Sequence, residues 1–336
     1  MSQSNAVAAE PEKNTSEPNS KWRWAKRALT VAFFILVPAL LFTLVKNIEW
    51  AEVEQALRDF SLQTLLIGAA IALASYLVFA SYDLIGRHYT GHTLPVRQVL
   101  PLAFVCYAFT LNLTAWVGGI ALRFRLYSRL GLDAPTITKI LSMSLITNWL
   151  GYIILMGFLF SFRLVDLPEK AKVGETAMQL VGFLLLGLAA FYFWACRFSK
   201  RRTFHIRQHE ITLPGVRLAF VQAALAMTNW MLMGLIIFTF MPDKVSYETV
   251  LGILLISSIA GVITHIPAGL GVLETIFITM LHSEVAKGSI LAALIGYRLI
   301  YFLLPLVIAC IIYLVLESRA KKMQQNNSQQ EPLASE

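Results

Sequence analysis

The stretch Gly261-Val-Ile-Thr-His-Ile-Pro-Ala-Gly-Leu-Gly-Val-Leu-Glu274 decides the fold, because it interrupts an apolar run that would otherwise pass for a membrane helix. Pro267 removes a backbone hydrogen-bond donor, and Gly269 and Gly271 relax the backbone, so we expect a helix to break here. In hydrocarbon, a broken helix is tolerated only where protein or a water-filled cavity covers the freed backbone groups. The stretch therefore predicts a covered or wet site inside a membrane.

A second stretch of the same design, Leu113-Thr-Ala-Trp-Val-Gly-Gly-Ile-Ala-Leu-Arg123, lies about 150 residues earlier. Each stretch carries a Thr, then a Gly-rich break, then a charge on the far side. The charge is Arg123 in the first stretch and Glu274 in the second. Paired interruptions at matching places in two halves of a membrane protein point to a transport site.

The composition indicates an integral membrane protein. Hydrophobic residues make up 57% of the chain and charged residues 14%, whereas soluble domains carry about 25% charged residues. The net charge of +8 would suggest a nucleic-acid partner for a soluble chain. Here we assign it to cytoplasmic loops that face anionic lipid, and we expect no nucleic-acid partner. The three cysteines lie in apolar segments, which favours neither a disulfide framework nor a clustered metal site.

Eight apolar segments follow a polar N-terminal tail, and most reach the roughly 20 residues needed to cross a bilayer. Basic residues before the first segment and after the last predict that both termini are cytoplasmic. The first segment is too long for a signal-peptide core and predicts a retained span. The segments are about 28–45, 62–83, 99–117, 137–160, 177–195, 218–240, 249–264 with its continuation to about 281, and 288–316.

The distribution of Lys and Arg favours re-entrant hairpins over eight simple crossings. Eight crossings would leave these residues almost evenly divided between the two sides. If the segments near 99–130 and 249–287 instead return to their own side, 20 Lys and Arg lie inside and 7 outside. The positive-inside rule favours the second arrangement.

We therefore predict an all-α polytopic membrane protein with six full transmembrane helices and two re-entrant helical hairpins. Residues 21–161 and 162–318 would form an inverted-topology repeat, because the two hairpins enter from opposite faces. Polar residues 1–20 and 319–336 are expected to be disordered tails.

Two motifs carry a family resemblance: Asn112-Leu-Thr-Ala-Trp-Val-Gly-Gly-Ile-Ala-Leu-Arg-Phe-Arg-Leu-Tyr-Ser-Arg-Leu-Gly131 and His265-Ile-Pro-Ala-Gly-Leu-Gly-Val-Leu-Glu274. With them the sequence resembles the flippase-type membrane domain of the lysylphosphatidylglycerol synthase family. The resemblance covers about residues 21–322, and its further matching positions are Tyr82-Asp83, Asn148-Trp149-Leu-Gly-Tyr152 and Asn229-Trp230.

In two-part members of that family, this domain moves an aminoacylated phospholipid across the bilayer and a C-terminal soluble domain makes the lipid. No such domain follows here before Glu336. The resemblance therefore implies lipid translocation without synthesis, in a bacterial inner membrane, by a protein that is not an enzyme. It does not imply that the cargo is lysylated.

Arg123 and Glu274 are the sharpest site candidates, because charges inside a membrane cost about 2.5–3.5 kcal/mol and usually face a cavity or a partner. We expect Arg123 to bind the lipid phosphate by a bidentate contact, with Glu274 as its counter-ion or as a proton-coupled gate. Helix N-termini at the breaks would add donors for an anionic headgroup. The alternative is a structural ion pair, or an arginine that snorkels to the interface.

Further candidates surround the two breaks. Asp83 either gates the cavity, pairs with Arg123, or is a solvated helix end. Arg298 joins the site if it has a partner such as Glu274. His265 either titrates or is a neutral, hydrogen-bonded histidine. The remaining candidates that would line the breaks are Asn112, Trp116, Gly118, Gly119, Pro267, Gly269 and Gly271.

We expect neither a metal nor a cofactor. His88 and His92 have the spacing of a two-ligand metal face, but no third ligand follows at a diagnostic spacing. There is also no Gly-x-x-x-x-Gly-Lys-Ser/Thr loop for a nucleotide. A proton or lipid gradient would therefore supply the energy.

The leading function is a phospholipid flippase or transporter for an anionic lipid of unspecified identity. A membrane-embedded lipid-phosphate hydrolase is disfavoured, because each break offers a single charge and no cluster of acid, base and phosphate-binding groups. A lipid-binding scaffold for a phospholipid synthase partner stays open, as does a homo-oligomer.

Overall fold

A computed structural model describes residues 51, 54–55, 58–113, 119–165, 174–199, 203–206, 209–242, 245–264 and 266–316. These residues belong to one compact unit, Ile48–Glu336. The expected first span at 28–45 and both expected tails lie outside the described residues. The candidates Trp116, Gly118 and His265 lie outside them too.

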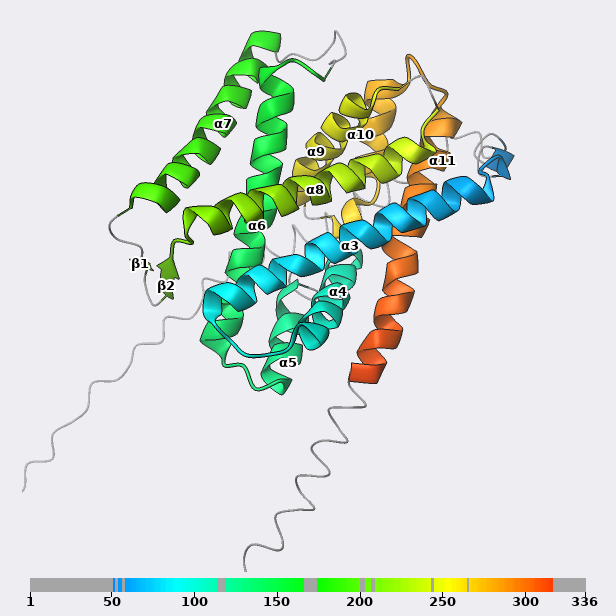
Figure 1. Cartoon of the computed structure of the whole chain (residues 1–336). Coiled ribbons are helices and arrows are strands. Elements are labelled where there is room, and N and C mark those ends of the chain that lie inside the picture. The colour runs from blue at the N-terminus through cyan, green and yellow to red at the C-terminus, as the bar shows by residue number, and fades with distance from the viewer. Residues whose placement is uncertain are drawn as a thin grey trace, which may run out of the picture. The chain divides into compact units, whose positions relative to one another are not determined.

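The described residues form long helices and one short β-hairpin (Figure 1). In chain order the elements are α3 (Leu62–Thr90), α4 (Val96–Asn112), α5 (Leu122–Arg129), α6 (Ala134–Ser161), α7 (Glu175–Phe198), β1 (Thr203–Ile206), β2 (His209–Thr212), α8 (Val216–Phe240), α9 (Tyr247–Thr264), the 3-10 turn η2 (Pro267–Gly269), α10 (Val272–Leu281), α11 (Lys287–Arg298) and the π-helical segment η3 (Leu299–Leu303). After η3 the α-helix of α11 resumes and continues to Leu316.

Local sequence explains where several helices begin and end. The hydroxyl of Ser61 accepts a 3.0 Å hydrogen bond from the backbone N–H of Thr64, which caps α3. α3 ends at Gly91 in the left-handed conformation, which a residue without a Cβ adopts most readily. Pro135 occupies the first turn of α6, where its missing N–H removes no helical bond.

The centre of the unit is formed by α3, α6 and α8, which pack against one another. Figure 1 shows α3 and α8 side by side, with α6 crossing behind α8. Gly151 permits the close approach of α6 to α8, because a Cβ there would lie 2.4 Å from the Cβ of Ala226. A larger residue would therefore force these two helices apart.

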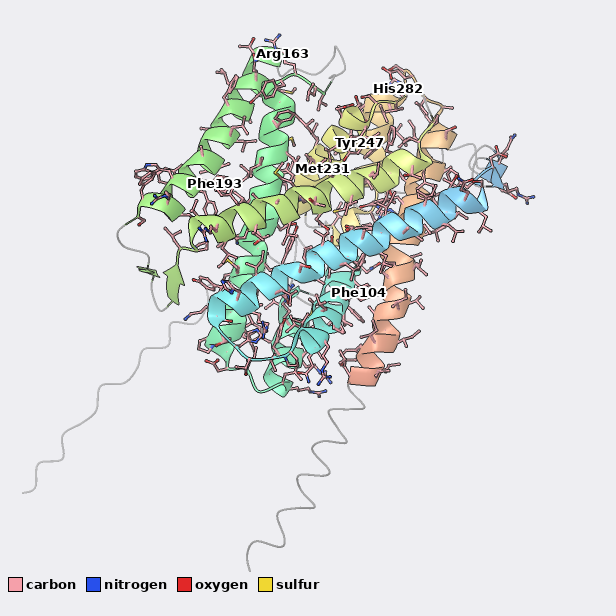
Figure 2. The ribbon with its side chains drawn as sticks, in the orientation of Figure 1. Phe104, Arg163, Phe193, Met231, Tyr247 and His282 are labelled. Atoms are coloured by element: carbon pink, nitrogen blue, oxygen red, sulfur yellow. The ribbon has the colours of Figure 1, made fainter. Side chains whose placement is uncertain are left out.

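Polar and aromatic contacts fix the outer helices to this centre. Tyr247 of α9 donates a 2.8 Å hydrogen bond to the carbonyl of Met231 in α8, and Figure 2 labels both residues where the two helices meet. Phe104 of α4, also labelled there, lies 4.9 Å between ring centroids from Tyr76 of α3. These contacts hold the two interrupted segments against α8 and α3.

The structure confirms both helix breaks. In the first, α4 ends at Asn112 and α5 begins at Leu122. In the second, α9 ends at Thr264, and Val272 begins α10 after a turn in which Ala268, Gly269 and Gly271 all have positive φ.

Five of the six predicted full spans are seen as long apolar helices: α3, α6, α7, α8 and α11 with its extension. A sixth helix of the described residues, α9, is also long and apolar enough to cross a membrane, although the sequence assigned it to a hairpin. The β-hairpin β1–β2, which lies between α7 and α8, was not expected from the sequence. The re-entrant insertion and the inverted repeat stay predictions.

Large apolar side chains are exposed on the outer helices, as expected for surfaces that face lipid. On α7 they include Leu184 at 72% and Leu180 at 65%, and on α11 Leu314 at 63%. A soluble protein rarely leaves such a continuous apolar surface exposed.

Candidate functional site

Asp83 of α3 and Arg123 of α5 form a buried ion pair beside the first break. Nη2 of Arg123 lies 2.9 Å from Oδ1 of Asp83, and Nε lies 3.2 Å from Oδ2, so the contact is bidentate. The side chains are 5% and 0% exposed, respectively. A planar guanidinium that matches both carboxylate oxygens is the strong form of this contact.

Two further groups complete the pair. The hydroxyl of Tyr127, one turn after Arg123 in α5, donates a 2.9 Å hydrogen bond to Oδ2 of Asp83. Ser144 of α6 accepts a 3.5 Å contact from Nη2 of Arg123. Three helices, α3, α5 and α6, therefore meet at this ion pair, in which Arg123 balances the charge of Asp83.

His92 lies next to this cluster, in the connection between α3 and α4. Its ring centroid is 6.4 Å from that of Tyr127. Both ring nitrogens are buried without a hydrogen-bond partner among the described residues. Burial lowers the pKa of His92 from its ordinary value, and Arg87 lowers it further, while Asp83 acts in the opposite direction.

Glu274 of α10 and Arg298 of α11 form the second ion pair. Nε of Arg298 lies 2.6 Å from Oε1 of Glu274, and the side chains are 15% and 13% exposed. The other carboxylate oxygen of Glu274 accepts a 2.8 Å hydrogen bond from the backbone N–H of Gly271. Glu274 therefore also caps the N-terminus of α10, where a negative charge is favourable.

Arg298 also holds the backbone of the second break. Its Nη1 donates a 3.0 Å hydrogen bond to the carbonyl of Ala268, and its Nη2 a 3.3 Å bond to that of Gly269. Ala268 has a φ of 55°, which is unfavourable for a residue with a Cβ. The arginine satisfies two carbonyls that the broken helix leaves free, which stabilises this turn.

The structure corrects the expected pairing of Arg123 with Glu274. Each of these residues instead pairs with a residue outside its own interrupted segment: Arg123 with Asp83, and Glu274 with Arg298. Both pairings were among the alternatives that the sequence left open. The charges at the two breaks are therefore neutralised separately.

The remaining described candidates have structural contacts. Asn112 ends α4 and donates to the carbonyls of Ala108, at 2.8 Å, and of Phe302 in η3, at 3.1 Å. A Cβ at Gly119 would lie 3.3 Å from the hydroxyl of Thr110. Pro267, Gly269 and Gly271 form or flank the turn that Arg298 holds.

A buried tyrosine network lies between α3, α4, α8 and α11, and the sequence analysis missed it. Tyr301 in η3 is its centre: its hydroxyl lies 2.8 Å from the hydroxyls of both Ser75 and Tyr107. Ser75 also donates a 2.8 Å bond to Asn229. Tyr76 donates a 3.0 Å bond to the carbonyl of Tyr301. The signal in the sequence is the presence of polar residues inside apolar segments.

The other residues of the resemblance join α6 to α8. The indole of Trp230 donates a 3.3 Å hydrogen bond to the carbonyl of Asn148, and its ring lies 5.6 Å from that of Tyr152. Tyr152 donates a 3.0 Å bond to the carbonyl of Leu255 in α9. These motif residues therefore hold α9 against the centre of the unit.

A groove of about 950 Å³ lies between α6 and α7, and aromatic residues such as Trp149, Phe191 and Trp194 line it. Neither ion pair is part of its lining. Within the described residues, no group of three or more His, Cys, Asp and Glu side chains is arranged to hold a metal ion.

Comparisons with known proteins agree with this architecture. A family model described as the lysylphosphatidylglycerol synthase TM region matches residues 27–309. The chain is 47% identical over 313 residues to the inner membrane protein YbhN of Escherichia coli, which covers 93% of this chain and 98% of that protein.

More distant relatives include proteins of similar length and longer ones. The chain is 23% identical over 295 residues to a phosphatidylglycerol lysyltransferase of Staphylococcus haemolyticus, covering 85% of this chain but only 33% of that protein. It is also 26% identical over 314 residues to an uncharacterized protein of Synechocystis, with 91% and 97% of the two chains covered. The family match and the similarity to YbhN each extend over most of the sequence, so this chain belongs to the family of the lysylphosphatidylglycerol synthase transmembrane region.

Proposed function

We propose that this protein moves an anionic or modified phospholipid across, or out of, the inner membrane of a bacterium. The headgroup would pass the two helix breaks while the acyl chains stay in the bilayer. The observation that carries this proposal is the presence of two largely buried ion pairs, each next to a break and each with one member, Asp83 or Arg298, in a helix apolar enough to cross a membrane. Ionisable residues inside a membrane are costly and mark substrate pathways by default.

Helix lengths support re-entrant hairpins at both breaks. The returning helices α5 and α10 have 8 and 10 residues, so they extend about 12 and 15 Å. The hydrocarbon core is about 30 Å thick, which neither helix can cross. α10 packs back along α9, as a helix that returns to its own side would do. With both termini cytoplasmic, the two hairpins would enter from opposite leaflets in an inverted repeat.

Arg123 is the proposed phosphate-binding residue, because its guanidinium matches a phosphate as well as it matches a carboxylate. Glu274 and Arg298 would control the second break, since they hold its backbone in place. Asn112, Gly119, Gly269 and Gly271 would shape the backbone that the headgroup passes.

The names of the relatives support the substrate class. Those of the staphylococcal relatives refer to phosphatidylglycerol, an anionic lipid whose charge is complementary to Arg123. We propose transport without chemical change, so the chain itself would not be an enzyme. It would act on lipid supplied by a synthase or already present in the bilayer.

Reconstitution of the full chain tests this proposal. Vesicles of phosphatidylethanolamine and phosphatidylglycerol would contain tail-labelled fluorescent phosphatidylglycerol, and a membrane-impermeant reductant would bleach the outer leaflet. We expect the protein to expose label from the inner leaflet, and Arg123→Lys and Glu274→Gln to slow this at least tenfold. Arg58→Gln is the matched control, because its ion pair with Glu54 is exposed, at 78% and 65%.

Exchange at the protein-free rate would contradict the proposal, as would full activity of both variants. Release of phosphate or another lipid product, followed by mass spectrometry, would favour an enzyme instead. Lipid binding without exchange would favour a scaffold for a synthase.

A further inference from the structure

Arg123 cannot bind a lipid phosphate through its Nε–Nη2 edge while Asp83 occupies that edge. Nε and Nη2 are both used by the two oxygens of Asp83. A phosphate that takes these donors must displace the carboxylate. Asp83 is 0% exposed, so water cannot replace the lost contact.

A buried carboxylate is strongly destabilised when it loses its cationic partner, which for Asp83 is Arg123 among the residues that the structure describes. Breaking a buried pair by removing one partner costs about 3–5 kcal/mol, and buried groups left in this state neutralise instead. Tyr127 still donates one hydrogen bond to Oδ2, but a neutral hydroxyl does not balance a full charge. Displacement of Asp83 therefore favours its protonation.

The surroundings of Asp83 offer one group suited to deliver that proton. Ordinary thiols and phenols hold their protons at neutral pH, and arginines stay protonated at all times. Histidine alone exchanges protons near neutrality. The charged, titratable and polar groups on the elements around Asp83 are Arg87, Tyr82 and His92 from α3 and its end, Cys106 from α4, Arg123 and Tyr127 from α5, and Ser144 from α6.

His92 is placed to deliver the proton, and its contacts with the described residues indicate no other role. Both of its ring nitrogens are buried and unpartnered among the described residues, which costs about 1–3 kcal/mol for each unsatisfied group. Its ring faces that of Tyr127 edge-on at 6.4 Å, and Tyr127 bonds directly to Asp83. His92 also lies outside the candidate spans, at the end of α3 where Arg87 and His88 lie.

We infer that Asp83 is a proton-binding site, and that it takes up one proton when Arg123 transfers its bidentate contact from Asp83 to an anionic lipid phosphate. This inference rests on the proposed function, and it adds proton movement coupled to lipid movement. The exchange conserves charge: Arg123 balances Asp83 before it, and the phosphate after it. The low-dielectric site thus never holds an unpaired charge.

The proton moves in a balanced relay. Neutral His92 takes a proton from the aqueous side at one ring nitrogen, while the N–H of its other ring nitrogen gives its proton, through one bridging water, to the oxygen of Tyr127. At the same time the Tyr127 O–H passes its own proton to Oδ2 of Asp83. The products are a neutral imidazole, an intact phenol and a neutral carboxylic acid. When the lipid leaves, Arg123 returns to Asp83 and the proton is released.

Infrared difference spectroscopy tests the uptake of the proton directly. The full chain in phosphatidylethanolamine vesicles would be compared with the same sample after addition of phosphatidylglycerol, at fixed pH. We expect the C=O band of a neutral carboxylic acid to appear with phosphatidylglycerol and to be absent in Asp83→Asn. No such band in the wild-type protein overturns the inference.

Proton flux supplies the second test. In vesicles with a trapped pH indicator, lipid movement should carry one proton per lipid, and apparent lipid affinity should fall about tenfold per pH unit above the working range. Asp83→Asn should carry no proton flux, and its lipid affinity should lose this pH dependence. Tyr127→Phe and His92→Gln should slow proton uptake at least tenfold. Tyr152→Phe is the matched control, because its hydroxyl makes one bond outside the cluster.

The two proposals fail separately. Lipid exchange that is independent of pH, with no proton flux, overturns proton coupling and leaves lipid movement intact. An infrared band that requires phosphatidylglycerol and Asp83, in a protein that does not exchange lipid, supports proton coupling and overturns transport.

Discussion

The two helix breaks carry the same kinds of charged residue but use them differently. At the first break, the hydrogen bonds of Arg123 to the described residues go to the side chains of Asp83 and Ser144, and Asp83 is fully buried. At the second, Arg298 contacts Glu274 and two backbone carbonyls, and the pair is partly exposed. In the first arrangement, the guanidinium of Arg123 can exchange its bidentate contact with Asp83 for one with another anion. In the second arrangement, Arg298 holds the turn at Ala268 and Gly269. We therefore expect loss of the Arg298 charge to loosen the backbone of this turn rather than to leave a fully buried charge without a partner.

The largest effect is expected for Arg123→Ala. This change leaves the carboxylate of Asp83 buried without its cation, which should cost about 3–5 kcal/mol of stability. The measurement is thermal or denaturant unfolding of the purified protein in detergent. A loss below about 1 kcal/mol would mean that water reaches Asp83, and the contrast between the breaks would fail.

Replacing both partners sharpens the same point. The double variant Asp83→Asn with Arg123→Gln removes both charges and keeps polar groups of similar size. It should recover most of the stability lost in Arg123→Ala, because no unpaired charge is left. A double-mutant cycle on the same unfolding measurement gives the coupling energy. Losses that simply add would show that the two residues do not depend on each other.

Arg298→Ala should cost less, about 1–3 kcal/mol. It removes the cation from Glu274 and frees two carbonyls, but the pair is partly exposed, so water satisfies some of the lost bonds. Hydrogen exchange should show faster exchange around Val272–Leu281, with little change in α3. Equal losses for Arg298→Ala and Arg123→Ala would remove the distinction between the two pairs.

The smallest effect concerns the turn itself. Gly271 has a φ of 79°, so Gly271→Ala should destabilise the protein by about 1 kcal/mol. Ala268 is already a non-glycine residue with positive φ, so Ala268→Gly should be neutral or slightly stabilising. Unfolding midpoints of the two variants check this, and equal shifts in the same direction would contradict it.

The sequence predicted the helices and their interruptions well, because these depend on local chemistry. Apolar runs of sufficient length, and the backbone properties of Pro267, Gly269 and Gly271, act over a few residues. It also identified four charged residues that form the two ion pairs. It did not predict which of these residues form ion pairs with each other, because pairing depends on helix packing. Asp83 and Arg123 are separated by 40 residues, and Glu274 and Arg298 by 24.

The tyrosine network shows the same limit more strongly. Ser75, Asn229 and Tyr301 come from three helices and are up to 226 residues apart. Each looks like an isolated polar residue in an apolar run, and only the packing of α3, α8 and α11 makes them partners. The role proposed for His92 could not be predicted from the sequence for a related reason, because its unsatisfied ring nitrogens are a property of the folded environment.

One turn of α11 ties the two breaks together. Arg298 donates hydrogen bonds to the carbonyls of Ala268 and Gly269 in the second break. Four residues later, the carbonyl of Phe302 accepts a hydrogen bond from the side-chain amide of Asn112, the last residue of α4 before the first break. The widened π-helical turn between them is an irregularity of the kind that proteins keep near functional sites. While these bonds hold, α11 and η3 contact both breaks, so we expect a displacement at one break to move the other.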